Sequence, residues 1–429
     1  MRRADFGGRK VALLGLGIDM AATLGAIADA RAGEMFAVDV DRERALRVLA
    51  DAGLGGVAVF ESVGGMPPAD VAVRSPGFPL YSADLQDRVR DGMETVTPLG
   101  LWLAERGNRP TVALTGTKGK STVSVLTAIA LEHLGRPAVT VGNIGIGPWT
   151  LAPSAAETVV IEVSSYQAAD LGCTPSIAAL TSIGEDHTDW HGSVDRYHRD
   201  KARVFTAPAI AGRRWAGVLS DVVLPPAFAG IGFCRVPAPA GGIRARNAHL
   251  AAATALAVAN EEVDPARVED LAAALLEAYP ELPGRFRLVA TVDAVRYVDD
   301  ALATNPLGLA ASIGEVGSEP LTVIVGGADR GAGLEPALAA LARRSGPTKV
   351  ICIDDAVAHE AQYAGAGATT RRSPDLEAAV RRAAEITTAG GLVLFSPGMP
   401  TPPAEGNWSN RSARFQAEVE RLALRTGDA

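Results

Sequence analysis

The stretch Thr115-Gly116-Thr117-Lys118-Gly119-Lys120-Ser121-Thr122 decides the fold. It follows an apolar run at 111–114 and opens a segment with apolar residues at helical spacing. The glycines let backbone amides approach an anion, and the start of a helix favours negative charge. Lys120 adds a mobile positive charge and Ser121 a hydroxyl for Mg²⁺. The stretch therefore predicts a phosphate-binding loop. The longer pattern of kinases and GTPases, GxxxxGK[ST], would require a glycine at position 114, where this chain has Leu114. The loop is therefore a shorter variant.

Acidic and imidazole side chains follow the next two predicted strands. Glu162 ends the apolar run 158–161, where a strand beside a phosphate loop carries a Mg²⁺ ligand. The cluster 185–191, which contains His187, suits either a divalent cation site or an acid-rich helix start, and both interpretations stay open. Lys201, taken alone, is typical of a solvated helix lysine.

Three buried-strand runs feed glycine-rich turns, at 11–15, 111–116 and 321–327. Short apolar strands separated by Ala/Leu-rich helical segments predict an α/β fold with parallel sheets covered on both faces. Ligands bind beyond the carboxyl ends of such strands, so we expect three ligand-handling domains. Turn-rich segments near 105–110 and 280–284 place the boundaries, giving domains 1–104, 105–283 and 284–429.

Composition excludes several classes of protein. The formal charge of −8 argues against nucleic-acid binding, and three scattered cysteines argue against a disulfide framework or zinc ribbon. The longest charge-free stretch, 137–156, is broken by proline and glycine, so it does not predict a membrane span. We expect a cytoplasmic enzyme with small-molecule substrates, which is neither an integral membrane protein nor an oligomer.

These motifs, in this order and spacing, resemble the Mur ligases, in particular the MurD-type branch that adds glutamate to UDP-N-acetylmuramoyl-L-alanine. The resemblance implies three domains: an N-terminal Rossmann-like domain for the UDP precursor, a central P-loop ATPase and a C-terminal Rossmann-like domain for the amino acid. It implies an ADP-forming ligase of peptidoglycan synthesis, and hence of cell shape and division, that works through an acyl phosphate.

The resemblance also assigns roles to individual residues. It implies catalytic roles for Lys120, His187 and Lys201. ATP would contact Gly116, Thr117, Lys118, Gly119, Lys120, Ser121, Thr122, Asn247, Arg285 and Asp300. Two Mg²⁺ ions would take ligands from Ser121, Glu162, His187 and Lys201, the last as a carbamylated lysine. The UDP precursor would contact Gly15, Gly17, Asp39, Ser75 and Asn143. The amino acid would contact Thr304, Arg330, Thr401 and Trp408.

Four positions differ from the common D-glutamate pattern: Leu302 and Arg330 replace lysines, Thr401 a serine and Trp408 a phenylalanine. An arginine binds a carboxylate as a two-pronged fork, unlike a lysine. The segment Leu101-Trp102-Leu103 and the phosphate loop also resemble the branch that adds L-glutamate. Together with the four differences, they favour that branch. A D-glutamate ligase remains the first alternative.

Three other interpretations are weaker. A dehydrogenase would use the glycine turn 15–20 and Asp39, but Met20 occupies the position of the third small residue. A folylpolyglutamate synthase-like ligase would have a glycine-rich signature at 162–165. A non-catalytic nucleotide-binding regulator would be expected to lose metal ligands, whereas this chain retains the full predicted set.

Overall fold

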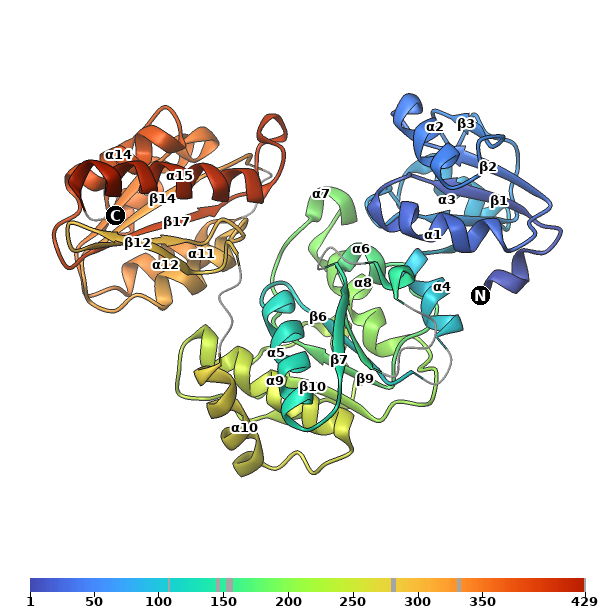
Figure 1. Cartoon of the computed structure of the whole chain (residues 1–429), viewed down its shortest axis with the longest axis horizontal. Helices are drawn as coiled ribbons and strands as arrows, with labels where there is room; N and C mark the ends of the chain where they lie inside the picture. The colour runs from blue at the N-terminus through green and yellow to red at the C-terminus, as the bar shows by residue number, and fades with distance from the viewer. Residues whose placement is uncertain (107–108, 144–146, 152–156, 279–282, 330–332, 428–429) are drawn as a thin grey trace. The chain divides into compact units, whose positions relative to one another are not determined.

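The computed structural model describes residues 1–106, 109–143, 147–151, 157–278, 283–329 and 333–427. Three β-sheets follow one another along the chain, each with helices around it (Figure 1). The chain forms two compact units, one of residues 1–239 and 245–278, the other of residues 240–244 and 279–429. The predicted α/β class with parallel sheets is confirmed; the exact domain boundaries stay a prediction.

The first sheet has the strand order β3-β2-β1-β4-β5, and all its strands are parallel. Its strands are β1 (Lys10–Leu14), β2 (Glu34–Val38), β3 (Ala58–Phe60), β4 (Val71–Arg74) and β5 (Glu94–Val96). Its helices are η1 (Arg3–Phe6), α1 (Ile18–Ala28), α2 (Arg42–Asp51), α3 (Ala83–Arg90) and α4 (Pro98–Glu105). The chain leaves β1 toward one edge and returns through β4 toward the other, and such a switch point opens a crevice at the strand ends.

The second sheet has the order β11-β10-β9-β6-β8-β7, again all parallel. Its strands are β6 (Thr111–Thr115), β7 (Ala138–Gly142), β8 (Thr158–Glu162), β9 (Ile177–Leu180), β10 (Trp215–Leu219) and β11 (Cys234–Val236). Its helices are α5 (Lys120–His133), η2 (Pro148–Thr150), α6 (Ser165–Ala168), α7 (Thr188–His191), α8 (Val194–Thr206), η3 (Pro226–Phe228), α9 (Ile243–Ala259) and α10 (Pro265–Glu277).

Helix α4 joins the first two sheets into one unit. Leu101 packs in the core of the first sheet, whereas Leu99, Trp102 and Leu103 pack in the core of the second. The helix starts at a capped turn, because the Thr97 side chain accepts a hydrogen bond from the Gly100 amide. Hydrophobic burial on both sides of one short helix explains why these two sheets form a single compact unit.

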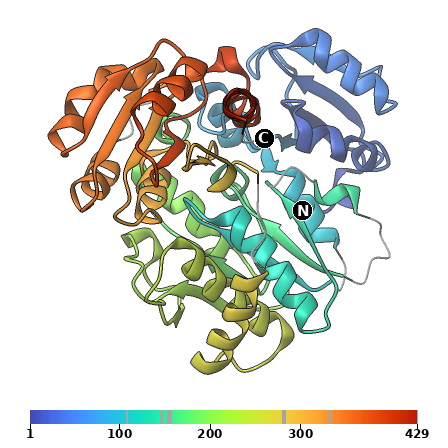
Figure 2. The same cartoon turned by 60° about the vertical axis from the view of Figure 1, so that its left-hand side comes forward.

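The third sheet has the order β12-β13-β17-β14-β15-β16, with only β12 and β13 antiparallel. Its strands are β12 (Arg287–Val292), β13 (Val295–Asp299), β14 (Leu321–Gly326), β15 (Thr348–Cys352), β16 (Thr369–Arg372) and β17 (Leu392–Gly398). One face packs against α11 (Pro306–Gly314), α12 (Glu335–Ala342) and α13 (Glu360–Gly365), the other against α14 (Leu376–Ile386) and α15 (Trp408–Thr426) (Figures 1 and 2). The turns η4 (Asp354–His359) and η5 (Pro403–Glu405) complete this unit. No helix within the described ranges is long and apolar enough to cross a bilayer.

Candidate active site

The phosphate loop lies between β6 and α5 and is held against the end of β9. The Thr117 amide donates to the Ser182 carbonyl at 2.9 Å, and the Lys118 amide to the Ser182 hydroxyl at 2.8 Å. Gly116 has φ +155°, and a Cβ there would lie 2.0 Å from the Thr181 hydroxyl oxygen. Only glycine therefore fits. Sequence analysis did not single out Thr181 and Ser182; their one local signal is that two hydroxyl residues directly follow an apolar strand.

Two lysines meet at this loop. The Lys120 ammonium donates to the carbonyls of Gly116 and Thr117, each at 3.1 Å. Lys201, on α8, is 1% exposed, and its amine donates to the same Gly116 carbonyl at 2.9 Å. Burial and the charge of Lys120 lower the pKa of Lys201 well below its ordinary value. Lys201 is thus a buried amine with a weakened hold on its proton, and not the solvated lysine that the sequence alone suggested.

Glu162 ends β8 and is 1% exposed. One carboxylate oxygen accepts a 2.9 Å hydrogen bond from the Asn143 side chain, and the Asn143 amide donates to the Glu162 carbonyl at 3.0 Å. The other carboxylate oxygen, Oε2, is buried and has no hydrogen-bond partner in the described structure. A buried, unsatisfied carboxylate oxygen is costly. A cation would satisfy it, so this oxygen fits the predicted Mg²⁺ ligand.

His187 precedes α7 with φ +52°, and its Nδ1 lies 2.8 Å from the Tyr166 hydroxyl. Partial desolvation and the charges of Lys120 and Lys201 lower the pKa of His187 to about 4, against the opposing effect of Asp186. The ring is therefore neutral at pH 7, as metal binding requires. Across the described ranges, no three His, Cys, Asp or Glu side chains gather as a metal cage. Mg²⁺ ordinarily keeps waters and phosphate oxygens beside one or two protein ligands, which this sparse set allows.

The other predicted ATP contacts fall in both units. Asn247, on α9, lies beside the loop, because a Cβ on Gly119 would be 3.0 Å from its side-chain oxygen. In the second unit, Asp300 follows β13, and its Oδ2 accepts hydrogen bonds from the hydroxyls of Ser312 and Ser396. Burial raises the pKa of Asp300 to about 6, although these bonds and the charge of Arg285 oppose the rise.

The predicted precursor residues gather at the switch point of the first sheet. A Cβ on Gly15 would be 3.3 Å from the Ser75 side chain, and a Cβ on Gly17 would be 3.1 Å from its hydroxyl oxygen. Gly15 follows β1 and Ser75 follows β4, so the turns after the two strands pack against each other. Asn143 instead lies beside Glu162 in the second sheet.

Asp39 already has partners inside its own domain. Its carboxylate accepts bonds from the amides of Leu16 at 2.8 Å and Asp41 at 2.9 Å, and from the Arg44 guanidinium at 2.8 and 2.9 Å. Partial burial opposes them, but these amide bonds and the Arg44 charge hold the pKa of Asp39 below its usual value. The Asp39 carboxylate thus holds the glycine turn in place, and its predicted contact with the precursor stays a prediction.

The predicted amino-acid residues lie in the second unit. Trp408 begins α15, and its ring would be 2.8 Å from a Cβ on Gly284. The Leu302 amide donates to the Gly284 carbonyl at 3.0 Å, so two of the atypical positions meet around this glycine. Thr401 is half-buried after β17, and Thr304 is half-buried before α11. Arg330 lies outside the described residues.

Two family models match this chain. The Mur ligase middle domain matches residues 114–214, and the Mur ligase glutamate ligase domain matches residues 284–399. A UDP-N-acetylmuramoyl-L-alanine–L-glutamate ligase of Micromonospora sp. is 34% identical over 99% of both chains. One of Salinispora tropica is 33% identical over 99% of this chain and all of the relative. A UDP-N-acetylmuramoylalanine–D-glutamate ligase of Geobacter metallireducens is 30% identical over 84% of each.

Solved structures with the same fold are more distant in sequence. UDP-N-acetylmuramate-alanine ligase from Thermotoga maritima has a TM-score of 0.52 and 15% identity, covering 97% of this chain and all of its own. Mycobacterium tuberculosis folylpolyglutamate synthase has a TM-score of 0.51 and 16% identity, covering 73% of this chain and 91% of its own. At such identities the likeness concerns the fold.

Proposed function

This chain belongs to the Mur ligase family of ATP-dependent, amide-bond-forming ligases, and we propose that it joins L-glutamate to UDP-N-acetylmuramoyl-L-alanine. The observation that carries the reaction class is the meeting of Lys120, Lys201 and the unsatisfied Glu162 oxygen around the phosphate loop. The substrates are proposed from the names of the relatives that match nearly the whole chain.

The proposed chemistry has two steps. A precursor carboxylate oxygen attacks the γ-phosphorus of ATP, which gives an acyl phosphate and releases ADP. The glutamate amine then attacks the acyl carbon, loses a proton and expels phosphate to leave an amide. Lys120 holds a positive charge where the phosphates carry negative charge, and the loop amides orient them. Bound Mg²⁺ would neutralise phosphate charge, held by Ser121 and Glu162 at one position and by His187 and Lys201 at another.

We propose that Lys201 carries a carbamate. Its amine is buried and its pKa is lowered, so the neutral form that attacks CO₂ is accessible. Attack forms an N–C bond, and loss of one proton leaves an anion with two oxygens. This change would turn a buried amine near Lys120 into a ligand of the kind that Mg²⁺ prefers.

The remaining assignments complete the proposal. Residues 1–104 would bind the UDP precursor through Gly15, Gly17, Asp39 and Ser75, and Asn143 of the next domain would also contact it. Residues 105–283 would bind ATP, and residues 284–429 the amino acid. Thr304, Arg330, Thr401 and Trp408 are proposed for the amino-acid pocket, and Asn247, Arg285 and Asp300 for the nucleotide. Because one chain supplies all these residues, we propose a monomer that acts in the cytoplasm.

A comparison of the two enantiomers of glutamate as substrates tests the proposal. Phosphate release is measured with UDP-N-acetylmuramoyl-L-alanine, MgATP and either L- or D-glutamate, and we expect the larger kcat/KM for L-glutamate. A larger value for D-glutamate would support the alternative that the Geobacter relative represents. Release with neither enantiomer would contradict the substrate assignment itself.

A further inference from the structure

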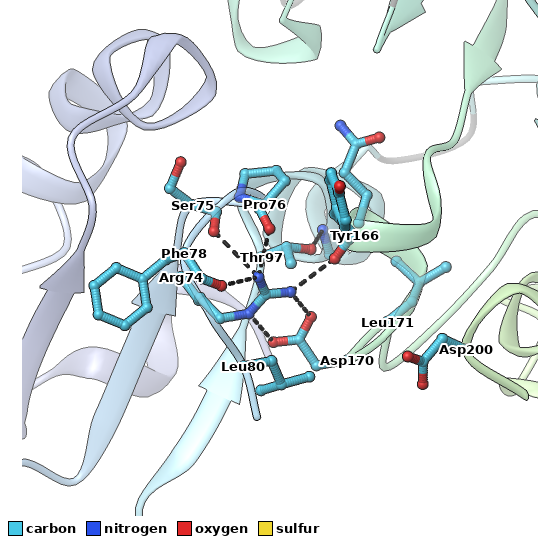
Figure 3. A network of polar contacts seen from close by, with 12 residues as sticks. Arg74, Ser75, Pro76, Phe78, Leu80, Thr97, Tyr166, Asp170, Leu171 and Asp200 are labelled. Carbon is cyan, nitrogen blue, oxygen red and sulfur yellow. Dashed lines mark hydrogen bonds and ion pairs between the residues drawn. The ribbon is translucent and has the colours of Figure 1, made fainter. Parts of the chain in front are cut away.

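Arg74 ends β4 and is completely buried, which is unusual for a charged side chain. Figure 3 shows its guanidinium group surrounded by acceptors. Its Nη1 donates to the carbonyls of Ser75 at 3.1 Å, Pro76 at 2.8 Å and Phe78 at 3.0 Å. One nitrogen thus holds three carbonyls of the turn that carries Ser75.

The other two nitrogens bind the second sheet's domain. Nε donates to Asp170 Oδ2 at 2.9 Å, while Nη2 donates to Asp170 Oδ1 at 2.7 Å and to the Tyr166 carbonyl at 2.7 Å (Figure 3). Asp170 is itself 8% exposed in its side chain, so the ion pair is shielded from water. A bidentate ion pair of this kind fixes the relative orientation of the guanidinium and the carboxylate as well as their distance.

Tyr166 links this network to the candidate metal side. It belongs to α6, and its hydroxyl lies 2.8 Å from His187 Nδ1. A second connection runs parallel to the first, because the Tyr81 hydroxyl donates at 2.6 Å to Asp200, the neighbour of Lys201 on α8. The segment after β4 is therefore bonded to α6, whose Tyr166 contacts His187, and to α8, which carries Lys201.

We propose that Arg74 is a positioning residue for precursor binding: it fixes the turn 75–78 against α6, so that the precursor site and the phosphate loop form one rigid template. The proposal rests on the proposed function in placing the UDP precursor at this turn. A lysine at position 74 would keep the charge, but its single nitrogen could not reach the turn and Asp170 in the same geometry.

The test compares four proteins: the wild type, Arg74→Lys, Arg74→Met/Asp170→Leu and Arg213→Lys. The double variant removes both charges together, which avoids leaving one buried and unpaired. Arg213 is the matched control, because its guanidinium also binds three carbonyls, those of Pro175, Val204 and Phe205, within the second sheet's domain alone. Thermal melts establish that each variant is folded.

We expect both Arg74 variants to raise KM for UDP-N-acetylmuramoyl-L-alanine roughly tenfold to a hundredfold, with KM for ATP changed less than about twofold. Arg213→Lys should lower the melting temperature but should not raise KM for the precursor relative to KM for ATP. A folded Arg74→Lys with both KM values unchanged would overturn the proposal. So would an equal rise in both.

A second measurement needs no turnover. Hydrogen exchange of the backbone amides of residues 75, 77, 78, 80 and 81 should quicken in both Arg74 variants and stay as in the wild type in Arg213→Lys. Calorimetry should show weaker binding of UDP alone in both Arg74 variants. Unchanged exchange and unchanged UDP binding would overturn the positioning role. If the wild type releases no phosphate with either glutamate, the proposed function fails, while exchange and UDP binding still decide the role of Arg74.

Discussion

Glu162 and Asp300 are two buried acids at the ends of strands, in different units of the chain, with opposite hydrogen bonding. Glu162 is 1% exposed and Asp300 7%. One oxygen of Glu162 has no partner, whereas Asp300 accepts bonds from the Phe286 amide and two serine hydroxyls. The hydrogen bonds within the domain thus offset part of the cost of burying the Asp300 charge, whereas one oxygen of Glu162 is left without a partner. The number of hydrogen-bond partners, and not the degree of burial, distinguishes the two carboxylates.

The largest expected effect follows from Glu162→Gln. Glutamine keeps an oxygen for Asn143 but removes the negative charge, so the fold should survive while phosphate release falls about a hundredfold to a thousandfold. MgATP should also raise the melting temperature less than it does in the wild type. Near-normal release in a folded Glu162→Gln protein would refute a ligand role for the unsatisfied oxygen.

Lys201→Ala should reduce turnover by about a hundredfold or more, since the contact with the Gly116 carbonyl and the proposed carbamate ligand would both disappear. If Lys201 carries the carbamate, short carboxylic acids should partly restore release by occupying the vacated space. Intact-mass measurement under CO₂ should show the added carboxyl in the wild type and not in the variant. Full activity of the alanine variant would remove Lys201 from the metal side.

Asp300→Asn should change the pH dependence of stability. The folded pKa of about 6 exceeds the usual 3.8, so the folded protein holds this proton more tightly than the unfolded chain. The stability that the folded protein gains from this tighter proton binding is fully present below the usual pKa. It is lost as the pH rises through the folded pKa. Relative to the wild type, the variant should therefore gain about 1–2 kcal/mol between roughly pH 5 and 7.5 in urea unfolding. Parallel pH curves for the two proteins would contradict the raised pKa.

Ser396→Ala should have the smallest effect, because Ser312 still donates to the same Asp300 oxygen. Loss of one such hydrogen bond should cost about 1 kcal/mol of unfolding free energy near pH 7.5. The cost should shrink at low pH, where Asp300 is protonated. Urea unfolding near pH 7.5 and at low pH tests this prediction. An equal cost at both pH values would mean that the Ser396 hydrogen bond does not depend on the charge of Asp300.

Local patterns in the sequence predicted the phosphate loop and an acidic residue at the end of a neighbouring strand, and the roles of these residues stay predictions. The phosphate loop and Glu162 follow apolar runs that are visible in the sequence, and parallel topology brings the ends of β6 and β8 together. Resemblance added Lys201, which its own surroundings in sequence did not distinguish. The structure then supplied the physical basis, a buried amine with a lowered pKa.

Long-range pairs explain what sequence analysis missed. Arg74 looks like the last residue of an ordinary strand, and its partner Asp170 is 96 residues away. Ser396 likewise lies 96 residues from Asp300. The resemblance implies that Asp39 contacts the precursor, which stays a prediction; the sequence does not show that its carboxylate also binds the Leu16 amide and the Arg44 guanidinium. Such roles depend on which elements the fold brings together.

The crowding at Gly116 also bears on drug resistance. A side chain there would collide with Thr181, and one at Gly142 would come within 2.3 Å of the Glu162 carbonyl oxygen. Both residues have positive φ, so the backbone itself disfavours any replacement. An inhibitor that contacted these two backbones would therefore meet few tolerated substitutions at its contact points, because each replacement would strain the backbone itself.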